Sequence, residues 1–275
     1  MKKNLILIFD DNCPLCTWYS RLFVRFHLLP ASGRVAFTQV PDSLFEQIDL
    51  SKAKNQIPLI DNDTKRVYYG IDAMVEVLSQ KFPIIRTICK WSLVNWFLRR
   101  LYKLISYNRK IIVAKKCGRG QFDCSPEFNF TYRTIFLAGF LFFNSIMLWP
   151  IHVHILSTLS YYHLSFWQLE SAHLVFVLAN CLLSCFLPFN TSLEYLGQVN
   201  MLALCTVLLC LPLFAITALF GAINFFIGFY LLLLTLFIIR EYFRRMQYAG
   251  VIPNYKMVAS LNLLCLFVFL IYLFI

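Results

Sequence analysis

Between residues 134 and 239 the chain carries no lysine or arginine, and only two acidic residues, Glu170 and Glu194. Over the whole chain 59% of the residues are hydrophobic and 14% are charged, against roughly 25% charged residues in an average soluble domain. A soluble fold of this size could not bury so much apolar surface, so the chain is predicted to be a membrane protein. The same composition excludes a disordered chain, a collagen and a secreted disulfide scaffold.

The positive charge lies mainly in the N-terminal part. Residues 1–133 have a net charge of +10, residues 134–239 of −2 and residues 240–275 of +3. Such a distribution is typical of cytoplasmic orientation and contact with anionic lipid, and no DNA- or RNA-binding motif accompanies it. The sequence also lacks a P-loop, a dinucleotide-binding glycine pattern and a serine-hydrolase elbow. A basic soluble part joined to a bilayer-embedded part is therefore expected.

Five long apolar runs in the C-terminal part are predicted to be transmembrane helices. Each approaches the roughly 20 residues needed to cross the hydrocarbon core. The third and fourth runs are so close together that four spans, with the middle pair re-entrant, are the alternative. The runs are residues 131–149, 166–187, 199–220, 222–239 and 257–275.

Basic residues beside these runs predict the orientation of the chain. They lie within residues 109–133 and, in the expected last loop, at Arg240, Arg244, Arg245 and Lys256, whereas residues 150–165 contain none. Because positive residues stay on the cytoplasmic side, the N-terminal part and the last loop are expected in the cytoplasm. The C-terminal end is then expected on the far side. We expect a multi-pass protein of a bacterial inner membrane.

The first 115 residues alternate strand-like and helix-like stretches. The apolar run at residues 5–10 is too short for a secretory signal and leads into acidic residues, so it is predicted to be a buried strand. Further strands are expected at 35–40, 58–61 and 66–69, and helices at 16–29, 41–50 and 70–81. The order β-α-β-α-β-β-α is typical of an α/β layer. Residues 84–112 form a basic amphipathic segment that lies either against this domain or on the membrane surface.

Two cysteines, Cys13 and Cys16, stand two residues apart between the first strand and the first helix. This position suits dithiol–disulfide chemistry, because a helix N-terminus stabilises a thiolate. We expect Cys13, nearer the helix start and more exposed, to be the nucleophile and Cys16 to be the resolving thiol. Asp10 is expected to accept or relay a proton if it is partly buried. The alternatives are half of a zinc site and a pair without chemistry. The spacing of the nearest other pair, Cys117 and Cys124, is wrong for a zinc knuckle.

The segment Phe9-Asp10-Asp11-Asn12-Cys13-Pro14-Leu15-Cys16 resembles the signature of the DCC family of thiol-disulfide oxidoreductases, named for an Asp-Cys-Cys motif. A second segment, Val67-Tyr68-Tyr69-Gly70-Ile71-Asp72-Ala73, is also similar to the family. The resemblance covers about residues 4–115 and implies an α/β thioredoxin-like domain at residues 1–115. A juxtamembrane linker at 116–130 and an all-α transmembrane helical bundle at 131–275 would follow, like the hydrophobic extension of some members.

The dipeptide Ile57-Pro58 fits this picture. Thioredoxin-like folds place a cis-proline beside the dithiol, where a strand opens, so we expect a cis bond here. Such a bond would expose backbone groups for pairing with a substrate chain, and Pro14, Ile57 and Pro58 are therefore expected to bind substrate. The alternative is a trans proline that begins an edge strand.

The remaining cysteines fall into two groups. Cys117 and Cys124 lie among basic residues just before the first span, and are either a second dithiol that exchanges with the first or two unconnected juxtamembrane cysteines, one of them lipidated. Within the predicted spans, packing between helices is favoured over an electron relay. The cysteines of the spans are Cys181, Cys185, Cys205, Cys210 and Cys265.

Histidines gather near the predicted outer face of the membrane. Glu170 and His173 point the same way at a spacing of three residues. With His152, His154 and His163 they are a candidate site for a metal or a quinone headgroup, although histidines at an interface are also ordinary.

These observations lead to a membrane-anchored thiol-disulfide oxidoreductase that uses a Cys-Pro-Leu-Cys dithiol. The redox-active disulfide would serve without a further cofactor and without a metal, while zinc and quinone stay open as alternatives. Its partners would be protein or small-molecule thiols and disulfides together with membrane lipids, and not nucleic acid. The alternative function is a membrane transporter or scaffold with a regulatory DCC-like domain.

Overall fold

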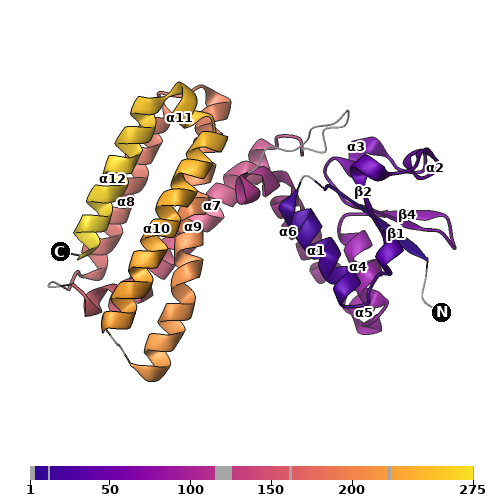
Figure 1. Cartoon of the computed structure of the whole chain (residues 1–275), viewed down its shortest axis with the longest axis horizontal. Helices are drawn as coiled ribbons and strands as arrows, with labels where there is room; N and C mark the ends of the chain where they lie inside the picture. The colour runs from indigo at the N-terminus through magenta and orange to yellow at the C-terminus, as the bar shows by residue number, and fades with distance from the viewer. Residues whose placement is uncertain (1–3, 12, 115–125, 161–162, 222–223, 275) are drawn as a thin grey trace. The chain divides into compact units, whose positions relative to one another are not determined.

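The computed structural model describes residues 4–11, 13–114, 126–160, 163–221 and 224–274. The chain divides into two compact units, Met1–Arg133 and Thr134–Ile275. Figure 1 shows the strands of the described residues in the first unit and long helices in the second.

A mixed four-stranded sheet forms the centre of the first unit. Its strands are β1 (Leu5–Phe9), β2 (Arg34–Ala36), β3 (Pro58–Asp61) and β4 (Arg66–Tyr69), in the spatial order β2-β1-β3-β4. β1 and β2 are parallel, whereas β3 is antiparallel to both β1 and β4. The expected hairpin is confirmed, with Pro58 opposite Tyr69 and Asp61 opposite Arg66.

Helices cover both faces of this sheet. On one face α1 (Pro14–Arg25), α4 (Ile71–Ser79) and α6 (Ser92–Val113) pack over Leu7 and Leu59, both fully buried. On the other face the short α2 (Asp42–Phe45) and α3 (Leu50–Ala53) pack over Ile8 and Ile60. The side chains of β1 alternate between the faces, as the period of a strand requires. This arrangement confirms the α/β thioredoxin-like fold.

Two expected elements differ from the structure. The strand expected at 35–40 ends at Ala36, and a 3-10 turn follows that buries Phe37 in the core. The helix expected at 41–50 is split into α2 and α3. Asp49 begins α3 as its N-cap, because its carboxylate accepts hydrogen bonds from the backbone N–H groups of Ser51 and Lys52.

Gly70, which joins β4 to α4, has φ +60° and ψ −123°, a conformation that other residues rarely adopt. An added Cβ would lie 3.0 Å from Gln56 Oε1 and 3.1 Å from a ring carbon of Tyr102. We therefore expect Gly70→Ala to lower the free energy of unfolding of this unit by about 1–3 kcal/mol, measured by urea denaturation. An unchanged transition for Gly70→Ala would contradict the strain at this position.

Among the residues that the structure describes, the second unit has five helices long and apolar enough to cross a membrane. They match the five predicted apolar runs and support an integral membrane protein. α9 and α10 are both of full length, which disfavours the re-entrant alternative. The helices are α7 (Phe130–His154), α8 (Phe166–Ser184), α9 (Phe189–Phe220), α10 (Asn224–Tyr248), the short α11 (Val251–Asn254) and α12 (Lys256–Phe274).

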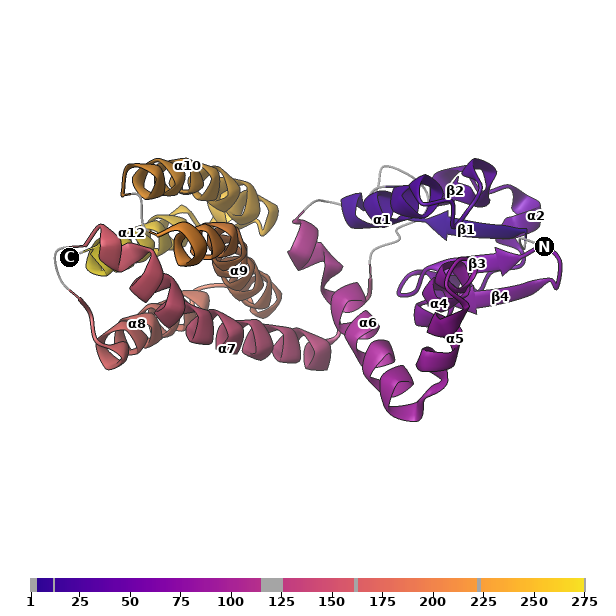
Figure 2. The same ribbon diagram turned by 90° about the horizontal axis from the view of Figure 1, so that it is seen from below.

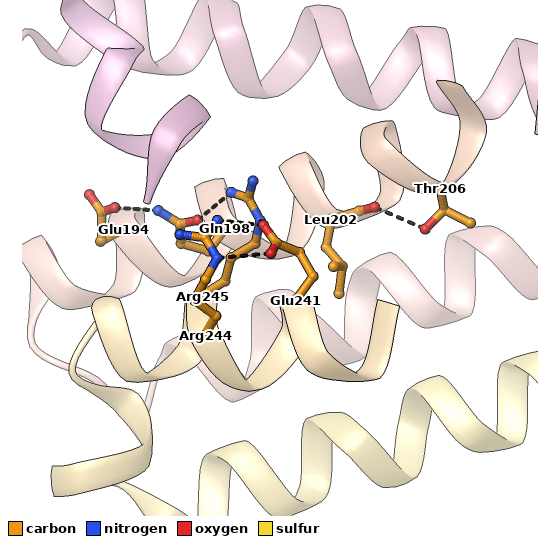
Figure 3. Close-up of polar contacts among 7 residues, drawn as sticks. All are labelled: Glu194, Gln198, Leu202, Thr206, Glu241, Arg244 and Arg245. Carbon is orange, nitrogen blue, oxygen red and sulfur yellow. Dashed lines mark hydrogen bonds and ion pairs between the residues drawn. The ribbon is translucent and has the colours of Figure 1, made fainter. Parts of the chain in front are cut away.

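The arginines expected in the last loop lie on α10 instead. Glu241 pairs with Arg244 three residues later and with Arg245 four residues later, at 2.8 Å for the second pair, and both spacings stabilise a helix. Arg245 also donates to Gln198 Oε1 on α9 at 2.8 Å (Figure 3). At 25 residues α10 is longer than the roughly 20 needed for the hydrocarbon core, so its basic end can reach the interface.

Candidate functional site

The two cysteines of the Cys-Pro-Leu-Cys motif lie where β1 leads into α1. Cys13 is the N-cap of α1, and its backbone N–H donates to the carbonyl of Asp10 at 3.2 Å. Pro14 occupies the first turn, where a missing N–H leaves no helical hydrogen bond unmade. The backbone N–H of Cys16 donates to Cys13 Sγ at 3.4 Å. The helix N-terminus therefore directs an N–H donor at the sulfur of Cys13.

Both thiols are buried, and both cysteines are free in this structure. The exposed fraction is 2% for Cys13 and 5% for Cys16, so the prediction that Cys13 is the more exposed of the two is wrong. The physical reason is that both side chains join the core cluster that contains Phe9 and Ile57. A substrate disulfide can reach Cys13 only when the surface over it opens.

The two thiols are driven to opposite protonation states. The hydrogen bond from the Cys16 side chain, the Cys16 backbone N–H and the charge of Arg109 together lower the pKa of Cys13 to about 6, against the opposing effects of burial and of Asp10. The hydrogen bond to Cys13 and burial raise the pKa of Cys16 well above its ordinary range. At neutral pH the pair thus holds one thiolate, on Cys13, and one thiol, on Cys16.

Arg109 brings a positive charge to this site from α6. Its guanidinium lies 3.5 Å from the Asp10 carboxylate, with exposed side-chain fractions of 11% and 6% for the two residues. It also donates to the carbonyl of Lys54 at 3.3 Å. In the sequence, Arg109 stands out only as part of a basic segment. Its role at the site depends on the packing of α6 against the sheet, for which the local sequence gives no signal.

Two tyrosines complete the surroundings of the dithiol. Tyr19, one turn along α1, forms a side-chain hydrogen bond with Cys16, and burial raises the pKa of its hydroxyl. Tyr102 on α6 accepts a hydrogen bond from the Ile57 N–H at 3.0 Å, and burial raises its pKa to about 12. Both hydroxyls therefore stay protonated at neutral pH. Neither tyrosine was among the predicted site residues.

The expected cis bond at Ile57-Pro58 is wrong, because the described residues contain no cis peptide bond. Pro58 instead begins β3, an inner strand, and lies opposite Tyr69. The N–H of Ile57 donates to Tyr102, and its carbonyl accepts from the Gly70 N–H at 3.0 Å. A trans bond keeps the chain extended between these two partners. Pairing with a substrate at Ile57 would require these backbone groups to be released.

The other cysteines are placed differently from the prediction. Cys117 and Cys124 lie outside the described residues. Cys210 is buried in a core cluster of the second unit, as expected for a packing residue. Cys181 and Cys185 on α8 are exposed, so the prediction that they pack between helices is wrong for this pair. Cys185 Sγ contacts the Cys181 carbonyl at 3.4 Å, which satisfies the thiol within its own helix.

The histidines of the second unit do not form a metal centre in the described part of the chain, where no three His, Cys, Asp or Glu side chains come close enough to hold an ion. His173 Nδ1 lies 3.9 Å from Glu170, which also accepts a hydrogen bond from Ser145. His152 is buried beside Trp149, and His154 packs edge-on against Phe214. These two histidines do not converge on one site, because each imidazole packs against a different aromatic side chain.

The lowered pKa of Cys13 predicts a particular dependence on pH. The rate of its alkylation by iodoacetamide should be constant above pH 7 and fall through a midpoint near pH 6. For a thiol with the ordinary pKa of 9.0, the rate would still rise between pH 7 and pH 9. The thiolate correspondingly stabilises the reduced fold above pH 9, and this contribution is lost as the pH falls through 6. Cys13 and Cys16 are the only cysteines in the tryptic peptide of residues 4–21, so mass spectrometry of this peptide reports their alkylation alone. A midpoint near 9 would contradict the electrostatics described here.

Comparison with known proteins agrees with this geometry. Residues 7–115 match the family model described as DCC1-like thiol-disulfide oxidoreductase. This part of the chain is therefore a DCC1-like thiol-disulfide oxidoreductase domain, and helices suited to anchoring it in a membrane follow. Comparison with curated proteins and with solved structures gives no match.

Proposed function

We propose that the protein is a membrane-anchored oxidoreductase in which Cys13 and Cys16 cycle between dithiol and disulfide. The observation that carries this proposal is the pairing of a thiolate-favouring Cys13 at the N-terminus of α1 with a protonated Cys16 one turn later. A low thiol pKa beside a second thiol is the arrangement that exchange chemistry needs. The redox group is the disulfide itself, and no further cofactor enters the proposed reaction.

The proposed reaction has two steps. The Cys13 thiolate attacks one sulfur of a substrate disulfide, which forms a mixed disulfide and releases the other substrate sulfur as a thiolate. Cys16 then loses its proton and attacks Cys13 Sγ, which releases the second substrate thiol and leaves the Cys13–Cys16 disulfide. The substrate disulfide gains two electrons, and the protein dithiol loses them. Because Cys13 begins as a thiolate, the protein releases one proton, from Cys16, and the other substrate thiolate takes its proton from the solvent.

Asp10 and Arg109 have complementary proposed roles. Cys16 must be deprotonated before the second step. The carboxylate of Asp10, 7% exposed and three residues before Cys13, is the proposed proton acceptor. Arg109 stabilises the thiolate of Cys13 and pairs with Asp10 at 3.5 Å.

Pro14 fixes the first turn of α1, and Ile57 and Pro58 contribute to a substrate surface if their neighbours open. If Cys117 and Cys124 form a second dithiol, they would be the first internal partner of this site.

The charge distribution supports a cytoplasmic location for this domain. The membrane that anchors it is proposed to be a bacterial inner membrane. In that reducing compartment the dithiol form dominates, so the protein would act as a reductant or a redox sensor towards protein or small-molecule disulfides.

Reaction with oxidised glutathione tests the proposal. The reduced full-length protein in detergent is mixed with the disulfide, and peptide 4–21 is then analysed by mass spectrometry after the free thiols have been blocked. We expect an intramolecular Cys13–Cys16 disulfide, with release of two glutathione thiols per protein. A peptide in which both cysteines remain blocked thiols, or a stable glutathione adduct without resolution, would refute the two-step cycle.

A second candidate function rests on the polar residues inside the second unit. Gln198, fully buried on α9, accepts a hydrogen bond from Arg245 and donates one to Glu194 (Figure 3). Ionisable residues within membrane spans often mark a transport pathway. Glu170, on the candidate span α8, accepts a hydrogen bond from Ser145 on α7. A transporter or scaffold with a regulatory DCC-like domain would keep its cellular function in Cys13→Ser and lose it in Glu170→Gln or His173→Ala. The opposite pattern is expected for the oxidoreductase.

A further inference from the structure

The outer surface of α5 (Pro83–Lys90) and α6 is apolar and exposed. On α6, Leu93, Phe97, Leu101 and Ile105 follow one another at intervals of four residues and form one stripe. Leu93 is 77% exposed, although leucine is among the residue types most often buried. Figure 2 shows α5 and α6 meeting at a sharp bend, and Trp91, 65% exposed, lies at this junction.

The opposite face of α6 is occupied by the domain itself. Tyr102 contacts Ile57, and Arg109 contacts Asp10 and the Lys54 carbonyl. Because these contacts hold the inner face on the sheet, α6 cannot rotate its apolar stripe into the core. The stripe therefore needs a partner outside the domain.

The charge beside the stripe is of one sign. Residues 83–113 contain seven lysines and arginines and no acidic residue. Within the part of the chain that the structure describes, Lys90, Lys103 and Lys110 make no ion pair. Arg100 lies over the ring of Trp96, 5.7 Å from its centroid. An exposed apolar stripe and tryptophans on a helix whose charged residues are all basic are typical of a helix that lies in the membrane interface.

We propose that the outer face of α5 and α6 docks onto an anionic lipid surface. The apolar stripe enters the boundary between headgroups and acyl chains, and the lysines contact lipid phosphates. The occupant is lipid rather than protein, because the flanking charge is uniformly basic. Docking is favoured further because the same chain enters the bilayer at α7, which keeps the domain close to the membrane. Docking of this face would hold the dithiol, which lies on the inner side of α6, near the membrane.

Quenching of single tryptophans by brominated lipid tests this docking in the full-length chain. One variant keeps only Trp96 and a matched variant keeps only Trp18, with the other four tryptophans replaced by phenylalanine. The two residues are similarly exposed, at 57% and 60%, but Trp18 lies on α1. Both variants are placed in nanodiscs of phosphatidylcholine and phosphatidylglycerol with brominated acyl chains. We expect Trp96 to lose more than about half of its fluorescence and Trp18 to keep it.

Each other result would overturn the proposal. Equal quenching of Trp18 and Trp96 would show that the contact is not specific to this face. If Trp96 is unquenched and accessible to acrylamide, the face is solvated. If Trp96 is unquenched but protected from acrylamide, protein covers it. Quenching that does not fall in Lys103→Gln with Lys110→Gln, or in discs of phosphatidylcholine alone, would refute the role of anionic lipid.

Discussion

The Cys13→Ser variant is expected to lose reaction with oxidised glutathione by at least about a thousandfold, because serine cannot replace the thiolate as nucleophile. The Cys16→Ser variant should still react once, since Cys13 keeps its sulfur. It should then accumulate a mixed disulfide that no neighbouring thiol resolves. Mass spectrometry of peptide 4–21 separates the two outcomes.

Cys89→Ser is the matched control for these variants. Cys89 is a half-buried cysteine on α5 of the same unit, outside the dithiol site, and its loss should leave the reaction unchanged. If Cys13→Ser retains the reaction, or if Cys16→Ser releases its adduct as fast as the unmodified protein does, the assignment of the two roles fails.

Removing the charge of Arg109 should have the second largest effect. In Arg109→Leu the Asp10 carboxylate stays buried without its guanidinium partner, and the loss of one partner from a buried pair costs about 3–5 kcal/mol of stability. The pKa of Cys13 should rise by about one unit or more, because a positive charge that favours the thiolate is gone. Urea denaturation measures the first effect, and the pH profile of alkylation measures the second.

Two further variants separate the charge of Arg109 from its shape and from the general effect of losing an arginine. Arg109→Lys keeps the charge and should restore most of the low Cys13 pKa. Arg99→Gln removes an arginine of the same helix that pairs with Asp72 at an exposed position, and should cost no more than about 1 kcal/mol. A Cys13 alkylation profile that is the same in Arg109→Leu and in the unmodified protein would rule out the proposed electrostatic role.

The sequence predicted those features that depend on local patterns. The hairpin of β3 and β4 was found because strand-like runs flank a turn, and α7, α8, α9, α10 and α12 were found because each carries a long apolar run. The position of the dithiol between β1 and α1 was equally local. Ends of elements were less accurate: α10 continues through Arg244 and Arg245, because Glu241 pairs with both of them.

Features that depend on tertiary packing could not be predicted in this way. Arg109 is far from Asp10 in the sequence and reaches it only because α6 packs on the same face of the sheet as α1. The burial of Cys13 and the hydrogen bond between Ile57 and Tyr102 depend on the same packing. The expectation of an exposed Cys13 was wrong for this reason. The cis bond before Pro58 was expected from the resemblance to thioredoxin-like folds, and the described residues contain none.

The most direct test of the account is the redox titration of the Cys13–Cys16 pair in the intact protein. The full-length chain is equilibrated in glutathione buffers from strongly reducing to strongly oxidising, thiols are trapped with an alkylating reagent, and peptide 4–21 is quantified. We expect a single two-electron transition from a doubly alkylated peptide to an internally disulfide-bonded one. A peptide that never forms the internal disulfide, even in the most oxidising buffer, would contradict it.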